Sequence, residues 1–418
     1  MVFEGERHAA DAFAMPGPEG RSGFWATVPV TARDQPRPLE LQLSARLEGG
    51  AAATAPLGSI DVVEREPPPA LEAEPADPDA DLIALCMATF EPDMELFRAQ
   101  VESLREQTDR GWVCLISDDS SSPERLAEMT GLIGDDRRFH LSPSPERLGF
   151  YRNFERALRL VPAEARLVAL CDQDDRWHGD KLEVLRGALA DATLVYSDQR
   201  LVDADGRVLR ETLWEGRSNN HTNLASMLVA NTVTGAATLF RRELLEPLLP
   251  FPDTPGFQFH DHWLGLVALA SGDIAYVDRP LYDYVQHAGA VFCDVTHGSR
   301  PRGGPGLIES WRAGYFYGYL ARQVAAEALL VRCGQALTPD KRRALERFVA
   351  AERSPAAFAW LAARPLRRLL GRTETLGTEI ELAEGLLWRR LAARRGNNRF
   401  PGPASFNQKR LRRWRARI

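Results

Sequence analysis

The sequence predicts an α/β protein with a Rossmann-like, mostly parallel sheet, a small β module before it and a helical region after it. From residue 81 onward, short apolar runs alternate with stretches of helical periodicity, as in α/β folds. Acidic residues directly follow several of these runs, and beyond residue 306 only helical spacing remains. Because 418 residues exceed the size of one compact core, we expect more than one domain.

We divide the chain into four parts. Residues 1–65 contain three strand-like pieces and predict a β module, for which packing, dimerisation and carbohydrate binding all stay open. Residues 66–80 are rich in Pro, Ala and acids and predict a linker. Residues 81–300 form the main α/β domain, and residues 301–418 form a helical region with a basic tail.

The expected elements of the main domain follow in order. Strands are predicted at 82–87, 112–117, 139–142, 167–171, 193–198 and 280–285. Helices are predicted at 94–107, 123–133, 153–160, 181–189 and 241–248, and another begins at 259. Apolar positions three and four residues apart predict further helices at 308–332, 339–353, 356–370 and 378–395.

The apolar run Leu167–Cys171 ends in three carboxylates within four residues, Asp172, Asp174 and Asp175. Carboxylates so close together repel one another unless a cation lies among them, and oxygen ligands suit Mg²⁺ or Mn²⁺ bound with a diphosphate. A metal and diphosphate site is one interpretation. The alternative is a solvated loop whose acids cap the next helix.

Two other predicted strands also end in polar side chains. Thr89 and Glu91 follow the first strand, and Asp118 and Asp119 follow the second. Parallel strands end at the same edge of a sheet, where open α/β sheets bind their ligands, so the three groups predict a nucleotide-sugar pocket. The alternative for Asp118 or Asp119 is capping of the helix that begins near Pro123.

A series of motifs makes a family resemblance specific. In chain order they are CMATFEP, ISDDSSSP, RLGFYRNFERAL, ALCDQDDRWHGDKL and LVYSDQRLVDADG. The series resembles the family-2 glycosyltransferases of the GT-A fold, most closely the bacterial rhamnosyltransferase-like branch, over residues 81–295. The resemblance implies an inverting, metal-dependent hexosyltransferase that moves a sugar from a nucleoside diphosphate to a glycan hydroxyl.

The resemblance also implies a set of site residues. Asp174 and Asp175 would hold Mg²⁺ or Mn²⁺, which acts as a Lewis acid toward the leaving diphosphate. The donor would be bound by Thr89, Glu91, Asp118, Asp119, Asn153, Asp172, Asp174, Gly235 and His287. After Gln286-His287 the chain reads Ala288-Gly289-Ala290, without the Asn that relatives usually carry, which puts the local hydrogen bonding in doubt.

Asp261 matches the acid that serves relatives as general base, taking the proton of the acceptor hydroxyl. At the start of a helix it would be expected to stay ionised, and the alternative is a simple N-cap. Its neighbours His262 and Trp263 are candidate acceptor contacts, and for Trp263 core packing stays open.

The charge of the chain is unevenly distributed. The net charge is −6, yet residues 361–418 hold fifteen Lys or Arg against four acids. The acidic body would repel nucleic acid, whereas the basic tail is either solvated or binds an anionic membrane. With no signal peptide or spanning segment in view, we expect a cytoplasmic protein, peripheral at the inner face of the plasma membrane if the tail binds there.

The expected partners are a dTDP- or UDP-linked sugar, with dTDP-rhamnose as the leading donor, and a cell-envelope polysaccharide or lipid-linked glycan as acceptor. Homo-oligomerisation stays open. The alternatives are a non-catalytic GT-A scaffold or carbohydrate-binding protein, and a nucleotidyltransferase. The last usually needs a Gly-rich basic phosphate loop, and none lies near Thr89.

Overall fold

The structure is a computed structural model. It describes residues 13–16, 22–25, 38–46, 52–60, 73–77, 80–214, 217–253, 259–286, 307–375 and 377–394. Strands β1–β4 belong to one compact unit, and the elements from β5 to α12, as far as Leu391, belong to another.

The first unit contains two antiparallel strand pairs among its described residues. β1 (Phe13–Pro16) pairs with β2 (Ser22–Trp25), and β3 (Leu39–Arg46) pairs with β4 (Ala52–Ile60). The register of β3 and β4 shifts between Leu41 and Gln42, where Gly58 on the partner strand has a φ of 114°. A positive φ of this kind suits glycine, which has no Cβ to clash.

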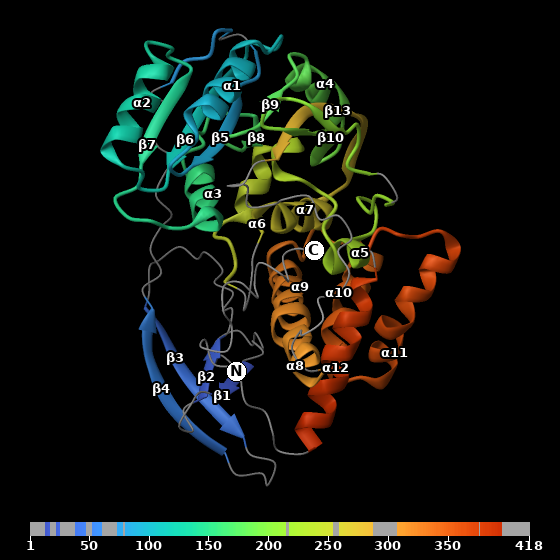
Figure 1. Ribbon diagram of the computed structural model, residues 1–418. Coiled ribbons are helices and arrows are strands. Elements are labelled where there is room, and N and C mark those ends of the chain that lie inside the picture. Colours follow the sequence, from blue (N-terminus) through green and yellow to red (C-terminus); the bar gives the residue numbers. More distant parts are fainter. Residues whose placement is uncertain are drawn as a thin grey trace. The chain divides into compact units, whose positions relative to one another are not determined.

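The second unit is built on one mixed sheet with the strand order β7-β6-β5-β8-β12-β10-β13-β9, and β11 pairs with β10 (Figure 1). Its strands are β5 (Ile83–Thr89), β6 (Trp112–Asp118), β7 (Phe139–Pro143), β8 (Leu167–Cys171), β9 (Arg176–Trp177), β10 (Leu194–Asp203), β11 (Val208–Arg210), β12 (Thr238–Arg241) and β13 (Ile274–Gln286). Every residue of β6 and β8 is buried, as expected for central strands with both faces covered.

The predicted meeting of strand ends is confirmed for the first half of the sheet. β5 lies between β6 and β8 and runs parallel to both. Thr89 is paired with Asp118, and Met87 with Cys171, so the polar residues that follow these strands lie at the same edge. The fold is of the GT-A type.

Strand β12 is among those that were not predicted. β12 occupies Thr238–Arg241, just before the predicted helix, and runs antiparallel between β8 and β10. It is too short for its alternation to be recognised in the sequence. The predicted helix at 241–248 is correspondingly a 3₁₀ turn, Arg242–Leu244, followed by the short helix α6 (Leu245–Leu248).

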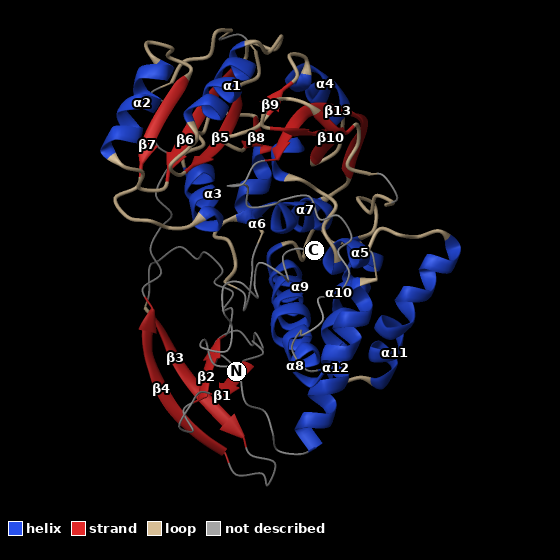
Figure 2. Cartoon of the chain, in the orientation of Figure 1, coloured by secondary structure: helices blue, strands red, loops and turns tan. Residues whose placement is uncertain are grey.

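Helices cover the sheet and form the C-terminal region, where Figure 2 shows no strand among α8 to α12. They are α1 (Met94–Arg105), α2 (Pro123–Ile133), α3 (Phe150–Arg159), α4 (Lys181–Leu189), α5 (Leu224–Val229), α7 (His260–Ser271), α8 (Leu307–Ala313), α9 (Leu320–Arg332), α10 (Pro339–Val349), α11 (Pro355–Ala363) and α12 (Thr378–Arg394). None of the described helices is long and apolar enough to cross a membrane.

Two predicted C-terminal helices are interrupted. A π-helical turn, Gly314–Tyr319, separates α8 from α9. There α12 crosses closely, since a Cβ on Gly314 would lie 2.8 Å from the carbonyl oxygen of Glu381. The predicted helix at 356–370 continues beyond α11 as the 3₁₀ helix η6 (Arg364–Leu370), which contains Pro365 in its first turn. Proline has no N–H to donate and fits the start of a helix.

Candidate active site

Asp118 holds together the ends of β5 and β6. Its Oδ1 accepts hydrogen bonds from the hydroxyls of Thr89 (3.1 Å) and Ser121 (2.6 Å), and its Oδ2 accepts from the amide of Ser121 (2.8 Å). The residue is fully buried. Helix α2 is capped instead by Ser122, which accepts from the amide of Arg125, so Asp118 does not cap it.

Asp119 and Asn153 connect the neighbouring segments by hydrogen bonds. The carboxylate of Asp119 accepts from the amides of Leu148 (2.5 Å) and Gly149 (2.9 Å), which fixes the loop before α3. The amide nitrogen of Asn153 donates to the carbonyls of Thr89 (3.1 Å) and Ser117 (2.8 Å). Both of its amide N–H groups are therefore used to tie β5 to β6.

Glu91 closes the loop that follows β5. Its φ of 41° lies in the left-handed region, which is uncommon for a residue with a side chain. The amide of Ser122 donates to its carboxylate at 2.6 Å, and Arg125 lies 3.7 Å away. The hydrogen bond from Ser122 is the main cause that lowers the pKa of Glu91. Among Glu91, Asp118 and Asp119, Glu91 is the most exposed.

The loop after β8 carries the acids Asp172, Asp174 and Asp175 and is attached to the β5 loop through Gln173. The side-chain oxygen of Gln173 accepts from the amide of Phe90 at 2.8 Å. Asp172 and Asp174 are half-buried, whereas Asp175 is only 1% exposed. Burial, and then the charges of Asp174 and Asp261, raise the pKa of Asp172 to about 7.

Lys181, at the start of α4, lies beneath this loop and is completely buried. Its ammonium group is 3.4 Å from the ring centre of Trp177 and 4.5 Å from that of Tyr282, and it donates to the carbonyl of Ala236. Burial lowers its pKa to about 7, against the opposing attraction of Asp175 and neighbouring groups. One buried cation therefore connects the acidic loop to the segment before β12.

Asp261 lies in the first turn of α7 and faces the acidic loop, since its charge contributes to the raised pKa of Asp172. Its Oδ1 accepts from the amide of His262 at 2.6 Å, and the amide of Gly235 also donates to it. Burial nevertheless raises its pKa to about 7. Desolvation thus outweighs the stabilising effect of the helix start, which the sequence had led us to expect would keep the group ionised.

Gly235 makes room for the start of α7. A Cβ at this position would lie 2.7 Å from Nε2 of His260 and 3.5 Å from the Cβ of Asp261. The His260 ring stacks on Phe154 with 3.7 Å between ring centres, and burial lowers its pKa to about 3. The close approach of Gly235 brings its amide to the carboxylate of Asp261, so a larger residue would move the carboxylate away from the acidic loop.

Part of the chain matches a family model. Residues 90–249 match the family model described as "Glycosyl transferase family 2". This stretch of the chain is therefore similar to the family-2 glycosyltransferases. No curated protein is significantly similar to the whole chain in sequence.

Two solved structures are distantly similar to this chain. S. aureus TarS 1–349, in complex with UDP-GlcNAc, is 14% identical with a TM-score of 0.47 and covers 76% of this chain and 92% of its own. The mannosyltransferase PcManGT from Pyrobaculum calidifontis, in complex with GDP-Man and Mn²⁺, is 18% identical with a TM-score of 0.38 and covers 78% of this chain and 90% of its own.

The two side chains predicted as acceptor contacts, His262 and Trp263, make internal hydrogen bonds. Nε2 of His262 lies 2.7 Å from the carbonyl oxygen of Met227, and burial lowers the pKa of this histidine to about 4. Trp263 is 3% exposed and donates its indole N–H to the carbonyl of Leu248. Core packing, left open for Trp263 by the sequence, is therefore its role in this structure.

Three carboxylates are crowded together in the acidic loop. Asp172 and Asp174 both contribute charge that raises the pKa of Asp175, after burial. One oxygen of Asp175, Oδ2, has no hydrogen-bond partner among the described residues. Within that same part of the chain, no three His, Cys, Asp or Glu side chains are placed to hold a metal by themselves. His287 lies outside the described residues.

Sequence reasoning missed three side chains in and around this candidate site. Gln173 was passed over between the acids, although it joins the two loops. Lys181 was expected to begin an ordinary helix. The signal available in the sequence was a lysine on the buried side of an amphipathic pattern, where lysine is rare. Arg147 stacks 3.6 Å from the ring centre of Phe90, a contact that no local pattern indicates.

Proposed function

We propose that the protein is an inverting glycosyltransferase that moves a sugar from a nucleoside diphosphate to a hydroxyl of a cell-envelope polysaccharide or lipid-linked glycan. The observation that carries the proposal is the placement of Asp261. It faces the acidic loop, and burial raises its pKa to about 7. A general base works best when its pKa lies near the working pH.

Asp261 would take the proton of the acceptor hydroxyl while that oxygen attacks the anomeric carbon. The amides of His262 and Gly235 hold the carboxylate in place, so its orientation does not depend on the substrate. The nucleoside diphosphate would leave on the opposite face, toward the loop of Asp172. Attack and departure on opposite faces give inversion at the anomeric carbon.

Asp174 and Asp175 would hold Mg²⁺ or Mn²⁺ with the diphosphate. The fit rests on the crowded carboxylates and on the oxygen of Asp175 without a hydrogen-bond partner among the described residues. A bound cation would neutralise the charge of the leaving diphosphate. Thr89, Asp118, Asp119 and Asn153 would then act mainly by shaping the nucleotide pocket, because their polar groups bond to the strand ends and loops around it.

The test is a thermal-shift panel with dTDP, UDP, GDP and CMP, each with and without Mg²⁺ or Mn²⁺. A ligand at 100 times its dissociation constant stabilises a protein by about 2.7 kcal/mol. We expect a shift that needs the metal and favours dTDP or UDP. dTDP-rhamnose is then the first donor to supply, with UDP- and GDP-sugars as comparisons. A panel without any metal-dependent shift contradicts the proposal and favours a non-catalytic member of the fold.

A further inference from the structure

The 3₁₀ helix η6 has its charged and apolar side chains on unexpected sides. Arg364 is 8% exposed, whereas Leu366, Leu369 and Leu370 are 63%, 83% and 81% exposed. In a 3₁₀ helix, residues three apart lie on the same side, so Arg364 and Arg367 share one side and Leu366 and Leu369 another. Arg364 and Arg367 face the interior and Leu366 and Leu369 face outward, while Leu370 is exposed at the end of η6.

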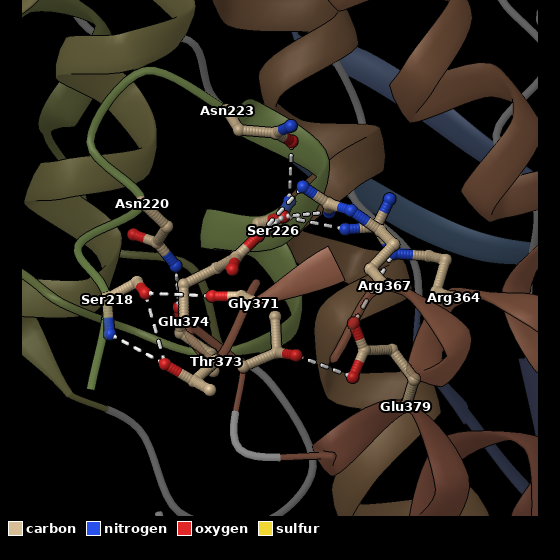
Figure 3. A network of polar contacts seen from close by, with 12 residues as sticks. Ser218, Asn220, Asn223, Ser226, Arg364, Arg367, Gly371, Thr373, Glu374 and Glu379 are labelled. Carbon is tan, nitrogen blue, oxygen red and sulfur yellow. Dashed lines mark hydrogen bonds and ion pairs between the residues drawn. The ribbon is translucent and has the colours of Figure 1, made fainter. Parts of the chain in front are cut away.

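A network of ionic and polar contacts holds the inner side (Figure 3). Arg364 and Arg367 each donate to the hydroxyl of Ser226 in α5, both at 2.7 Å. Arg367 pairs with Glu374 at 2.8 Å, and Arg364 lies 3.5 Å from Glu379. Both carboxylates are buried, so the network fixes which side of η6 is turned outward.

The outward leucines do not contribute to folding stability. Burying a leucine side chain stabilises a protein by roughly 1.5–3 kcal/mol, and these three forgo most of that gain. Ile380, which is 48% exposed, extends this surface. Its Cδ1 and a guanidinium nitrogen of Arg368 both lie within 4 Å of the position that a Cβ on Gly377 would occupy, so Ile380 lies near Arg368 of η6. A cluster of exposed apolar side chains of this kind marks a binding surface.

The charge of this segment favours an anionic partner. Residues 354–373 contain four arginines and neither Asp nor Glu. The acids that follow in sequence, Glu374 and Glu379, are buried and paired with Arg367 and Arg364. Arg368 and Arg372 remain exposed beside the leucines. Segments that lie in the interface of a membrane combine leucine and arginine side chains in this way.

We propose that the η6 face, made of Leu366, Arg368, Leu369, Leu370, Arg372 and Ile380, docks onto the surface of an anionic lipid bilayer. The leucines would enter the headgroup region, and the arginines would bind lipid phosphates. This surface belongs to the folded part of the chain. It is independent of the basic tail near the C-terminus and of the sugar-transfer reaction.

The test is sedimentation of the full-length protein with vesicles of phosphatidylglycerol and phosphatidylcholine, and with vesicles of phosphatidylcholine alone. We expect binding to the first kind only, weakened by added salt. The double variant Leu369→Ser/Leu370→Ser should bind more than about tenfold more weakly, because each leucine loses its apolar transfer energy. Arg368→Gln should weaken binding about fivefold, the effect of one cation near an anionic surface.

Matched controls separate this surface from general effects. Val331→Ser removes an apolar side chain that is 49% exposed on α9, and Arg98→Gln removes an exposed arginine on α1; neither should change vesicle binding. Thermal shifts with nucleotide confirm that each variant is folded.

Three results would overturn the proposal. The first is a wild-type protein that does not bind anionic vesicles. The second is binding that survives the leucine substitutions and is lost only when Lys409 and the arginines after it are replaced. The third is a leucine variant with unchanged vesicle binding but a lower mass in light scattering, which would make the η6 face a contact between copies of this chain.

Discussion

Two sets of carboxylates lie at the same edge of the sheet and are held in opposite ways. Asp118 and Asp119 are buried but accept five hydrogen bonds between them, from the loops around them. Asp172 and Asp175 have few such bonds, Asp261 accepts from the amides of His262 and Gly235, and burial raises the pKa of each of the three. Buried acids with full hydrogen bonding stabilise a fold, whereas acids left short of partners are suited to ligands and chemistry.

The largest expected effect is on the second set. We predict that Asp261→Asn lowers sugar transfer about a thousandfold, because the amide cannot accept the hydroxyl proton. Binding of nucleoside diphosphate should change by less than about twofold, since the rest of the pocket is intact. Nucleoside diphosphate released per enzyme measures the first, and calorimetric titration the second.

Asp273→Asn is the matched control, because it changes an aspartate that is 93% exposed just beyond the other end of α7. Its activity should equal that of the wild type. Equal turnover in Asp261→Asn would remove the general base from the mechanism.

Replacing an acid of the first set should lower the stability of the fold. Asp118→Ala leaves the hydroxyls of Thr89 and Ser121 and the amide of Ser121 without their acceptor. We predict that the free energy of unfolding falls by about 3 kcal/mol, measured by urea denaturation. Asp205→Ala, at an exposed turn, should cost less than about 0.5 kcal/mol. A stable Asp118→Ala variant that has lost only nucleotide binding would place Asp118 in the second set.

The affinity for nucleotide should show whether the acidic loop after β8 binds a metal. We predict that Asp174→Ala weakens binding of nucleoside diphosphate ten- to a hundredfold in the presence of Mn²⁺, the usual size for a disturbed metal site, on the order of 1.4–2.8 kcal/mol. Without metal, wild type and variant should bind alike. Asp180→Ala, which changes an exposed acid paired with Arg279, serves as control. An identical loss with and without Mn²⁺ would exclude a metal role for Asp174.

The smallest effect is the dependence of activity on pH. Asp261 acts as a base only when it is ionised, and its pKa is about 7. The ratio kcat/KM should therefore rise with pH and level off above a midpoint near pH 7. A profile that is flat from about pH 5 to about pH 8 would show that its carboxylate is not the group that takes the proton.

Much of the fold could be predicted because its signals are local. The strand β6 and the helix α2 follow from apolar runs and from a Pro after a capping Ser, and they lie where the sequence placed them. β12 could not be predicted, because its four residues become a strand only between β8 and β10. Tertiary pairing, not propensity, decides such short segments.

The sequence also indicated which acids meet at this edge of the sheet, but not how each carboxylate is held. Asp118 ends one buried strand and Asp172 follows another, and the residue types alone do not show that Asp118 accepts two hydrogen bonds from Ser121, three residues on. The two acids also differ through residues distant in the chain, such as Thr89 for Asp118 and Asp261 for Asp172. Lys181 illustrates the same limit, because its partners are two aromatic rings and a carbonyl 55 residues away.

The most direct test is the free energy of unfolding of wild type and Asp261→Asn as a function of pH. The folded pKa of Asp261, about 7, lies above its ordinary value of 3.8, so the native state binds the extra proton between these values. Stability from this group is present below pH 3.8 and is lost as the pH rises through 7.

We therefore predict that the two proteins are similar near pH 4 and that the variant is more stable by about 2 kcal/mol at pH 8, after allowance for partial exposure. That result would place Asp261 in the second set, with Asp172 and Asp175. A variant that is less stable than the wild type at every pH would show instead that Asp261 is a structural cap of α7 and would contradict the account.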